Sequence, residues 1–291
     1  MTGKPALDPR RNAVRDDLAS AGLRGKVEAP RFVEGTQAMI ARAAVPLRKV
    51  PVASAALETE ALFGETVRVF DTADGWAWVQ LDGDRYVGYL PADTLSTAVK
   101  LASHRVKATG TFAYAVPDIK SPPIMHLSLN ARLSVAETVD RFYRLEGGGY
   151  VIARHVAGLD WTDRDFAEVA ERFLGTPYLW GGRTRIGLDC SALVQLSLQA
   201  CGITCPRDSD MQRAELGEPV EAPADFEGLQ RGDLVFWAGH VGIMSDSVMM
   251  LHANAHAMSV AFESLPEAAA RIKAASGGGI EAIRRLPALT G

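Results

Sequence analysis

The sequence contains few cysteines, no long hydrophobic segment and no excess of positive charge. Three cysteines in 291 residues are unlike the paired sets that an oxidising compartment favours. No apolar run approaches the roughly 20 residues that span a bilayer, and segment 1–22 lacks the apolar stretch of a secretory signal. A net charge of −4 gives no electrostatic attraction to nucleic acid or anionic membranes. We therefore expect a cytoplasmic protein that binds neither.

Several common functional motifs are also missing. The chain has no G-x-S-x-G nucleophile elbow, no P-loop, and no G-x-G-x-x-G between a strand and a helix. Two close pairs of metal-ligand residue types occur, Cys201 with Cys205 and His252 with His256. No feature of the sequence brings these pairs together in a zinc site. We expect neither a metal nor another cofactor.

The composition is that of a globular protein with more than one domain. Apolar residues make up 47% and charged residues 23% of the chain, which is sufficient for a hydrophobic core, and the length favours two or three domains. Residues 8–21 are predicted to form a short helix. Asp8 suits its N-cap, Pro9 its first turn and Gly22 its end. With a wrapping segment, this helix makes up an N-terminal region over residues 1–43.

Short runs of alternating polar and apolar residues, broken by Gly, Asp and Pro, dominate the next part of the chain. This pattern predicts small β-strands and hairpins, and residues 44–99 suit a five-stranded barrel. Residues 100–158 repeat the pattern, and both segments close with a turn, a Tyr and an extended apolar strand. We interpret the two segments as copies of one small barrel.

The pattern changes in the C-terminal segment, residues 159–291. A capping-box-like start at Thr162 and an apolar stripe predict a helix that ends at Gly175. A second helix is predicted over residues 190–200, and strands are predicted at 234–237, 240–244 and 249–252. Helices followed by an antiparallel sheet indicate an α+β domain.

Cys190 is the first residue that could carry chemistry. Asp189 suits the N-cap of the second helix, so Cys190 falls in its first turn, where the helix dipole and free N–H groups favour a thiolate. The same N–H groups could receive an oxyanion. A lone cysteine near a helix is also commonly an inert buried side chain, and Cys201 and Cys205 are interpreted in that way.

A thiol nucleophile needs a base, usually a histidine that a third group holds. His240 begins a predicted strand after a glycine turn, and His252 lies on the next strand. Adjacent antiparallel strands would let the second histidine bond the first and fix its tautomer. His256 is left as a rim residue without a role. The remaining histidines, in the barrels, are interpreted as ordinary polar residues: His104, His126 and His155.

Four separated blocks resemble the NlpC superfamily of cell-wall cysteine peptidases: GTPYLWGGRTRIGLDCSALVQLSLQACGI, PRDSDMQ, LQRGDLVFWAGHVGIM and LHANAH. The resemblance covers roughly residues 162–265 and implies a papain-like fold in circularly permuted form. It implies that Cys190 is the nucleophile, His240 the base and His252 the orienting residue, with Tyr178 supporting the oxyanion or the substrate. The chain has Ala192 where the family commonly has Gly, a change that a helix tolerates.

The N-terminal barrels extend the resemblance. An NlpC domain behind two bacterial SH3-like barrels is similar to the γ-D-glutamyl-L-diamino-acid endopeptidases of the dipeptidyl-peptidase VI type, which recycle murein peptides. In these enzymes the first barrel closes one end of the cleft and recognises a free N-terminal L-Ala. The resemblance implies that Glu58, Tyr86 and Asp208 bind the substrate ammonium. It also assigns further residues to the substrate pocket: Trp180, Asp189, Ser191 and Ser209.

The expected reaction is hydrolysis of the bond between γ-D-Glu and a diamino acid, meso-diaminopimelate or L-Lys, with release of L-Ala-D-Glu. The expected substrates are murein tri- or tetrapeptides with a free N-terminal L-Ala. Two alternatives remain open. The barrels could make the protein a cell-wall or peptide-binding module with an inactive peptidase fold, or the fold could serve an amidase or acyltransferase, which would not need Glu58 or Tyr86.

Overall fold

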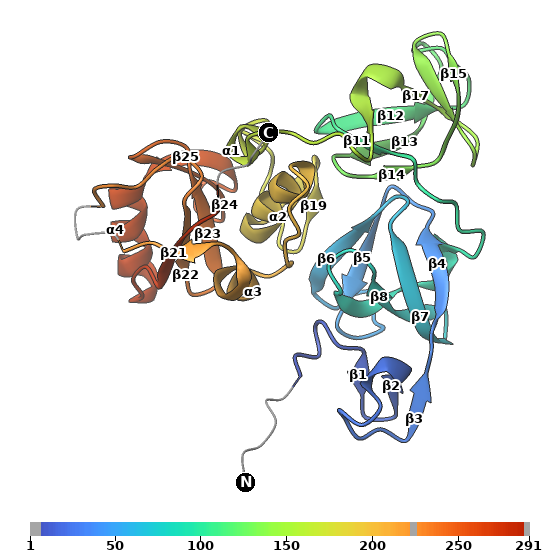
Figure 1. Cartoon of the computed structure of the whole chain (residues 1–291), viewed down its shortest axis with the longest axis horizontal. Helices are drawn as coiled ribbons and strands as arrows, with labels where there is room; N and C mark the ends of the chain where they lie inside the picture. Colours follow the sequence, from blue (N-terminus) through green and yellow to red (C-terminus); the bar gives the residue numbers. More distant parts are fainter. Residues whose placement is uncertain (1–6, 222–225, 288–291) are drawn as a thin grey trace. The chain divides into compact units, whose positions relative to one another are not determined.

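The computed structural model describes residues 7–221 and 226–287. The chain divides between Leu159 and Asp160 into two compact units. Figure 1 shows that the first unit is built from strands and that the four α-helices belong to the second. No helix in the described part of the chain is long and apolar enough to cross a membrane.

The prediction of a helix over residues 8–21 is wrong. Only one turn forms, in which the carbonyl oxygen of Asp8 accepts hydrogen bonds from the amides three and four residues later. The chain then becomes extended, because Leu18 is buried against Phe70 and Trp78 of the following barrel. This packing outweighs the local helix signals. The region contains β1 (Val14–Arg15), β2 (Leu18–Ser20), the 3-10 helix η1 (Ala21–Leu23) and β3 (Arg31–Val33).

The first barrel is a seven-stranded antiparallel sheet in the order β10-β4-β7-β8-β9-β5-β6. It begins with β4, ahead of residue 44, and therefore takes in part of the segment expected to wrap. Asp74 and Gly75 join β7 to β8 with φ of 52° and 80°, as a type I′ hairpin turn requires. The strands are β4 (Thr36–Ile40), β5 (Ala44–Arg48), β6 (Leu57–Leu62), β7 (Thr66–Ala73), β8 (Trp76–Leu81), β9 (Val87–Pro91) and β10 (Leu95–Ser96), with the 3-10 helix η2 (Ala92–Thr94).

Still within the first unit, residues 104–158 form a further group of strands, arranged as two small sheets in the orders β14-β11-β18 and β13-β12-β17-β16-β15. Alternating strand residues such as Val106, Leu127 and Val151 are fully buried and form its core. The strands are β11 (His104–Val106), β12 (Gly110–Tyr114), β13 (Pro123–Ser128), β14 (Arg132–Leu133), β15 (Val135–Val139), β16 (Phe142–Leu145), β17 (Tyr150–Ile152) and β18 (Val156–Gly158), with the 3-10 helix η3 (Ala153–His155).

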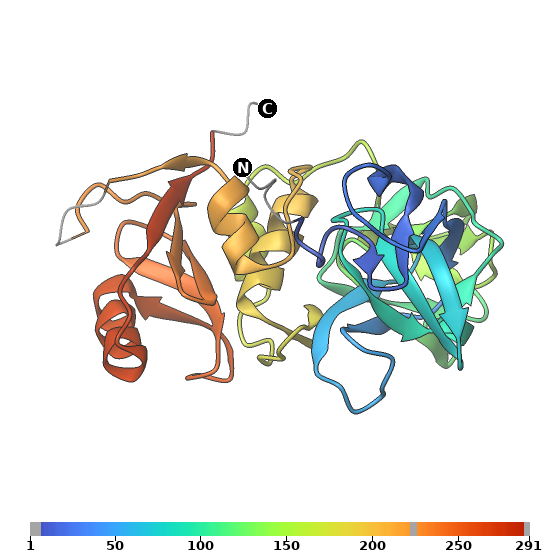
Figure 2. The ribbon, with the colours of Figure 1, turned by 90° about the horizontal axis from the view of Figure 1, so that it is seen from below.

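The second unit has an antiparallel six-stranded sheet in the order β21-β26-β22-β23-β24-β25. Figures 1 and 2 show helices α2 and α4 on opposite sides of this sheet. The helices are α1 (Phe166–Glu171), α2 (Cys190–Ala200), α3 (Ser209–Glu215) and α4 (Leu265–Ser276). The strands are β19 (Arg183–Thr184), β20 (Gly187–Leu188), β21 (Glu218–Pro219), β22 (Leu234–Trp237), β23 (His240–Met244), β24 (Met249–Asn254), β25 (Ser259–Ser264) and β26 (Ala282–Arg285).

Candidate active site

Cys190 is the first residue of α2, as the sequence predicts. Asp189 is the N-cap, and its Oδ1 accepts a hydrogen bond of 2.8 Å from the amide of Ala192. The cysteine is 7% exposed. Because it is the first residue of the helix, it lies at the positive end of the helix dipole, where the first backbone N–H groups have no partner within the helix. This position suits both a sulfur anion and a developing oxyanion.

The resting thiol is nevertheless protonated. Burial raises the pKa of the Cys190 thiol to about 12, and the negative charge of Asp189 adds to this increase. A backbone hydrogen bond from Val241 and the positive charge of Arg207 act in the opposite direction, as smaller effects. Because the thiol does not ionise unaided at neutral pH, a nucleophilic role would require a nearby base to accept its proton.

His240 and His252 form a hydrogen-bonded pair, and His240 precedes Val241, whose backbone bonds the Cys190 sulfur. Strands β23 and β24 pair with Ile243 opposite Leu251, and continuing this register puts both imidazoles on one face as diagonal neighbours. Nε2 of His240 lies 2.9 Å from Nδ1 of His252. This contact leaves Nδ1 as the other ring nitrogen of His240, and the Cys190 sulfur accepts a backbone hydrogen bond from Val241, the next residue of β23.

Both imidazoles are neutral at neutral pH. His252 is fully buried, and burial lowers its pKa to about 4. Burial also lowers the pKa of His240 to about 3, with a smaller contribution from the neighbouring His252. The site therefore rests as a neutral thiol and two neutral imidazoles.

A carboxylate and a guanidinium follow His252, and the sequence analysis missed both. Oε2 of Glu263 lies 3.1 Å from Nε2 of His252, although this contact is not aligned as a well-formed hydrogen bond. Arg271 donates two hydrogen bonds to the same carboxylate, of 2.8 and 2.7 Å. Glu263 is two residues beyond the position of β25 that pairs with His252, and this strand register was the one signal that could have identified it.

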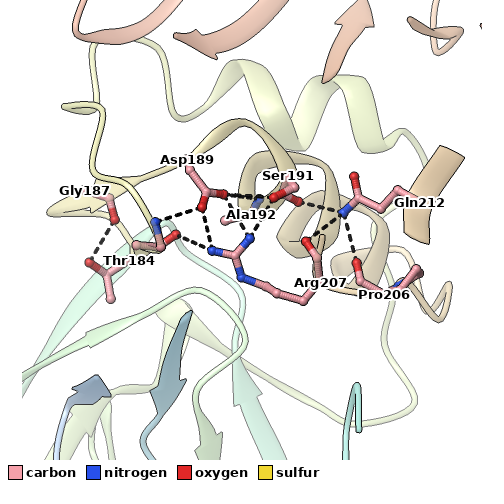
Figure 3. Close-up of polar contacts among 10 residues, drawn as sticks. Thr184, Gly187, Asp189, Ser191, Ala192, Pro206, Arg207 and Gln212 are labelled. Carbon is pink, nitrogen blue, oxygen red and sulfur yellow. Dashed lines mark hydrogen bonds and ion pairs between the residues drawn. The ribbon is translucent and has the colours of Figure 1, made fainter. Parts of the chain in front are cut away.

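The side chains of Asp189 and Ser191 bond to protein groups (Figure 3). Arg207, which is 1% exposed, donates to both Asp189 oxygens at 3.0 and 2.7 Å and to the Ser191 hydroxyl at 2.7 Å. Asp189 Oδ2 also accepts from the Gly181 amide at 2.9 Å, and Gln212 donates to the carbonyl oxygens of Ser191 and Pro206. These contacts favour a structural role for both residues at the start of α2; their expected part in substrate binding stays a prediction.

Tyr178 lies close to the thiol. Its amide donates to the Met258 carbonyl oxygen at 2.9 Å, and it forms an isolated β-bridge with Leu188, two residues before Cys190. Burial, then the charges of Cys190 and Asp189, raise the pKa of its phenol to about 12. Tyr178 is therefore a neutral hydroxyl that can donate a hydrogen bond near the sulfur.

The other expected binding residues differ in exposure. Trp180 is 64% exposed, while Asp208 and Ser209 are half-buried at the start of α3. In the first barrel, Glu58 is half-buried on β6, and Tyr86 is 2% exposed within the hydrophobic core. The burial of Tyr86 favours a packing role. The assignment of these residues to substrate binding stays a prediction.

No group of three or more His, Cys, Asp or Glu side chains that could hold a metal occurs among residues 7–221 and 226–287. All three cysteines are buried, and none of them forms a disulfide bond.

Comparison with protein families gives two matches. Residues 47–95 match the bacterial dipeptidyl-peptidase SH3 domain, and residues 175–273 match the NlpC/P60 family. The second match contains Cys190, His240 and His252. Together with the sheet and helices described above, the matches confirm an α+β chain in which an SH3-like domain precedes a papain-like domain.

Among curated relatives, a γ-D-glutamyl-L-lysine dipeptidyl-peptidase of Bacillus cereus is 30% identical over 64% of this chain. Dipeptidyl-peptidase 6 of Lysinibacillus sphaericus is 26% identical over 75% of the chain. A γ-D-glutamyl-L-lysine dipeptidyl-peptidase of Bacillus subtilis is 26% identical over 72%. The chain spans 61%, 87% and 77% of these three relatives, respectively.

Solved structures of NlpC/P60 proteins share the fold of this chain. The crystal structure of an NlpC/P60 family protein from Bacillus cereus aligns with a TM-score of 0.72 and 25% identity, over 87% of this chain and 100% of that one. An NlpC/P60 endopeptidase from Photobacterium damselae aligns with a TM-score of 0.59 and 12% identity, over 85% of this chain and 70% of that one. The second likeness concerns the fold alone.

Proposed function

We propose that this chain is a cysteine peptidase that cleaves γ-D-glutamyl bonds in peptides derived from peptidoglycan. Residues 175–273 match the NlpC/P60 family, and relatives named as γ-D-glutamyl-L-lysine dipeptidyl-peptidases support this proposal. The observation that carries the proposal is the arrangement of Cys190, His240 and His252 at the start of α2. A thiol at a helix N-terminus, a neutral imidazole beside it and a second imidazole bonded to the first are the parts that acyl transfer through sulfur needs.

The reaction follows from these parts. Nδ1 of His240 takes the thiol proton as the Cys190 sulfur attacks the γ-carbonyl carbon, and the N–H groups at the start of α2 stabilise the oxyanion. The phenol of Tyr178 donates a further hydrogen bond there. His240 then gives the proton to the leaving amine, and a thioester remains. Water, deprotonated by His240, attacks the thioester, and the thiol re-forms as the acid product leaves.

For the substrate, we propose a murein tri- or tetrapeptide with a free N-terminal L-Ala. Cleavage after γ-D-Glu, before L-Lys or meso-diaminopimelate, would release L-Ala-D-Glu during cytoplasmic recycling of these peptides. Two of the relatives are named for a γ-D-glutamyl-L-lysine bond, and an SH3 domain of the dipeptidyl-peptidase type precedes the catalytic domain. Glu58, Tyr86 and Asp208 are proposed to bind the substrate ammonium, the two carboxylates through strong charged hydrogen bonds and the phenol through its oxygen as an acceptor.

The test compares L-Ala-γ-D-Glu-meso-diaminopimelate and its L-Lys analogue, each with a free and an acetylated N-terminus. Products are identified by mass spectrometry, and Cys190→Ala is the control. Cleavage of only the free peptides, abolished by Cys190→Ala, supports the whole proposal. Equal cleavage of acetylated peptides contradicts the assigned roles of Glu58, Tyr86 and Asp208. No cleavage of any peptide contradicts the proposed reaction and leaves an inactive binding module, or an amidase or acyltransferase, as the alternatives.

A further inference from the structure

The chain of polar contacts that begins at His240 does not end at His252. Beyond it lie Glu263 of β25 and Arg271 of α4, which the proposed mechanism does not use. The side chain of Glu263 is 18% exposed and that of Arg271 is 27% exposed. The carboxylate therefore lies between a fully buried imidazole and a partly exposed guanidinium.

The direction of each hydrogen bond in this series of contacts, from His240 to Glu263, can be worked out from His240. A neutral imidazole has one N–H and one lone pair. To accept the thiol proton, His240 must have its lone pair on Nδ1 and its hydrogen on Nε2. Nε2 then donates to Nδ1 of His252, 2.9 Å away, so that nitrogen must be the acceptor. His252 therefore has to carry its own hydrogen on Nε2, the atom that faces Glu263.

A carboxylate selects this tautomer because an ionised carboxylate can only accept hydrogen bonds. The two hydrogen bonds from Arg271 are the largest influence on Glu263 and lower the pKa of its carboxyl group, so it is ionised at neutral pH. We propose that Glu263, held by Arg271, is a positioning residue that fixes the tautomer of His252 and thereby leaves the lone pair of His240 facing the thiol.

The same carboxylate also favours the charged intermediate. When His240 accepts the thiol proton it becomes a cation. The half-buried carboxylate of Glu263 raises the pKa of His240, whereas the charge of Arg271 lowers it by more, so Glu263 offsets part of the effect of its own partner. Several groups act on the two imidazoles, from α2, α4, β25 and the loop after β24: Asp189, His256, Glu263 and Arg271. Of these, Glu263 is the one that contacts a histidine nitrogen directly.

The inference rests on the proposed roles of Cys190, His240 and His252, so its test includes measurements that need no peptide substrate. The variants are Glu263→Gln, which keeps the shape and removes the charge, together with Arg271→Met and Arg271→Lys. A matched control is Glu171→Gln. Glu171 also accepts a hydrogen bond from an arginine in the second unit and is 29% exposed.

The first measurement is the nitrogen-15 spectrum of the histidine rings in the full chain, which distinguishes the tautomers. The wild type should show His252 protonated at Nε2 and unprotonated at Nδ1, and Glu263→Gln should show a mixture, whereas Glu171→Gln should not. The second is the rate of Cys190 alkylation by iodoacetamide from pH 5 to 9. Glu263→Gln and Arg271→Met should slow it at neutral pH, and Arg271→Lys should restore most of the rate.

With a cleavable peptide, Glu263→Gln should lower kcat by about 10- to 100-fold, by analogy with the groups that orient metal-binding histidines, and leave KM nearly unchanged. The inference is overturned if Glu263→Gln keeps the wild-type His252 tautomer and alkylation rate, or if it affects kcat no more than Glu171→Gln. If the wild type cleaves no peptide but the tautomer and alkylation results hold, the proposed substrate is wrong and the positioning role stands.

Discussion

Removing Arg207 should destabilise the second unit strongly. Its guanidinium is buried and bonds to Asp189 and to the Ser191 hydroxyl. Replacement by Met keeps much of the volume but leaves the Asp189 carboxylate buried without its cation. Breaking a buried ion pair from one side typically costs about 3–5 kcal/mol. For a unit of this size, that corresponds to a fall in Tm on the order of 10 °C.

The reasoning is checked with a double-mutant cycle followed by urea denaturation and circular dichroism. Asp189→Asn removes the negative charge and keeps a good N-cap residue. The double variant should therefore be more stable than Arg207→Met alone, because no uncompensated charge remains. Two results would refute the argument: Arg207→Met within about 1 kcal/mol of the wild type, or additive losses in the double variant. Alkylation of Cys190 should also be slower in Arg207→Met, since Arg207 lowers the thiol pKa.

Three further predictions concern pH, the phenol and metals. Because burial lowers the pKa of His240 and His252 to about 3 and 4, the unfolded chain binds protons below pH about 6.5 that the folded chain does not. Stability in urea should thus fall from pH 6.5 towards 4, by about 1.4 kcal/mol per pH unit for each histidine, and a flat profile in this window would contradict their burial as neutral groups. Tyr178→Phe should lower kcat by about 100-fold if its hydroxyl bonds the oxyanion, and steady-state kinetics with unchanged turnover would remove that role. Incubation with EDTA should leave peptide cleavage unchanged, since the proposed thiol mechanism uses no metal ion and the described residues contain no cluster of three or more His, Cys, Asp or Glu that could hold one; inactivation reversed by added zinc would oppose this.

Local signals predicted the parts of the site that depend on one element. Asp189 as N-cap and Cys190 in the first turn follow from a few adjacent residues, and the predicted helix over 190–200 coincides with α2. The pairing of His240 with His252 followed from two short strands joined by a turn, because two strands with so short a connection can pair in only a few registers.

The rest depends on contacts between distant segments. Arg207 reaches Asp189 across 18 positions in sequence, and neither residue type reveals the other as its partner. In the sequence, Glu263 is an ordinary polar residue of a strand. Its role becomes visible only in the fold, where β25 pairs with β24 and Arg271 of α4 bonds to the carboxylate. The wrong prediction of a helix over residues 8–21 has the same origin, because the packing of Leu18 against the barrel outweighs the local helix signals.

The burial of α2 has a consequence for how far Cys190 can move. Every residue from 190 to 198 is buried, and α2 packs against α1, β23 and β24. Segments of this kind open mainly when the whole domain unfolds, so the amide hydrogens of α2 should be among the slowest in the molecule to exchange with deuterium. Adaptation to a new peptide must therefore come from the loops around Cys190, because the helix that carries the sulfur has the rigidity of the hydrophobic core itself.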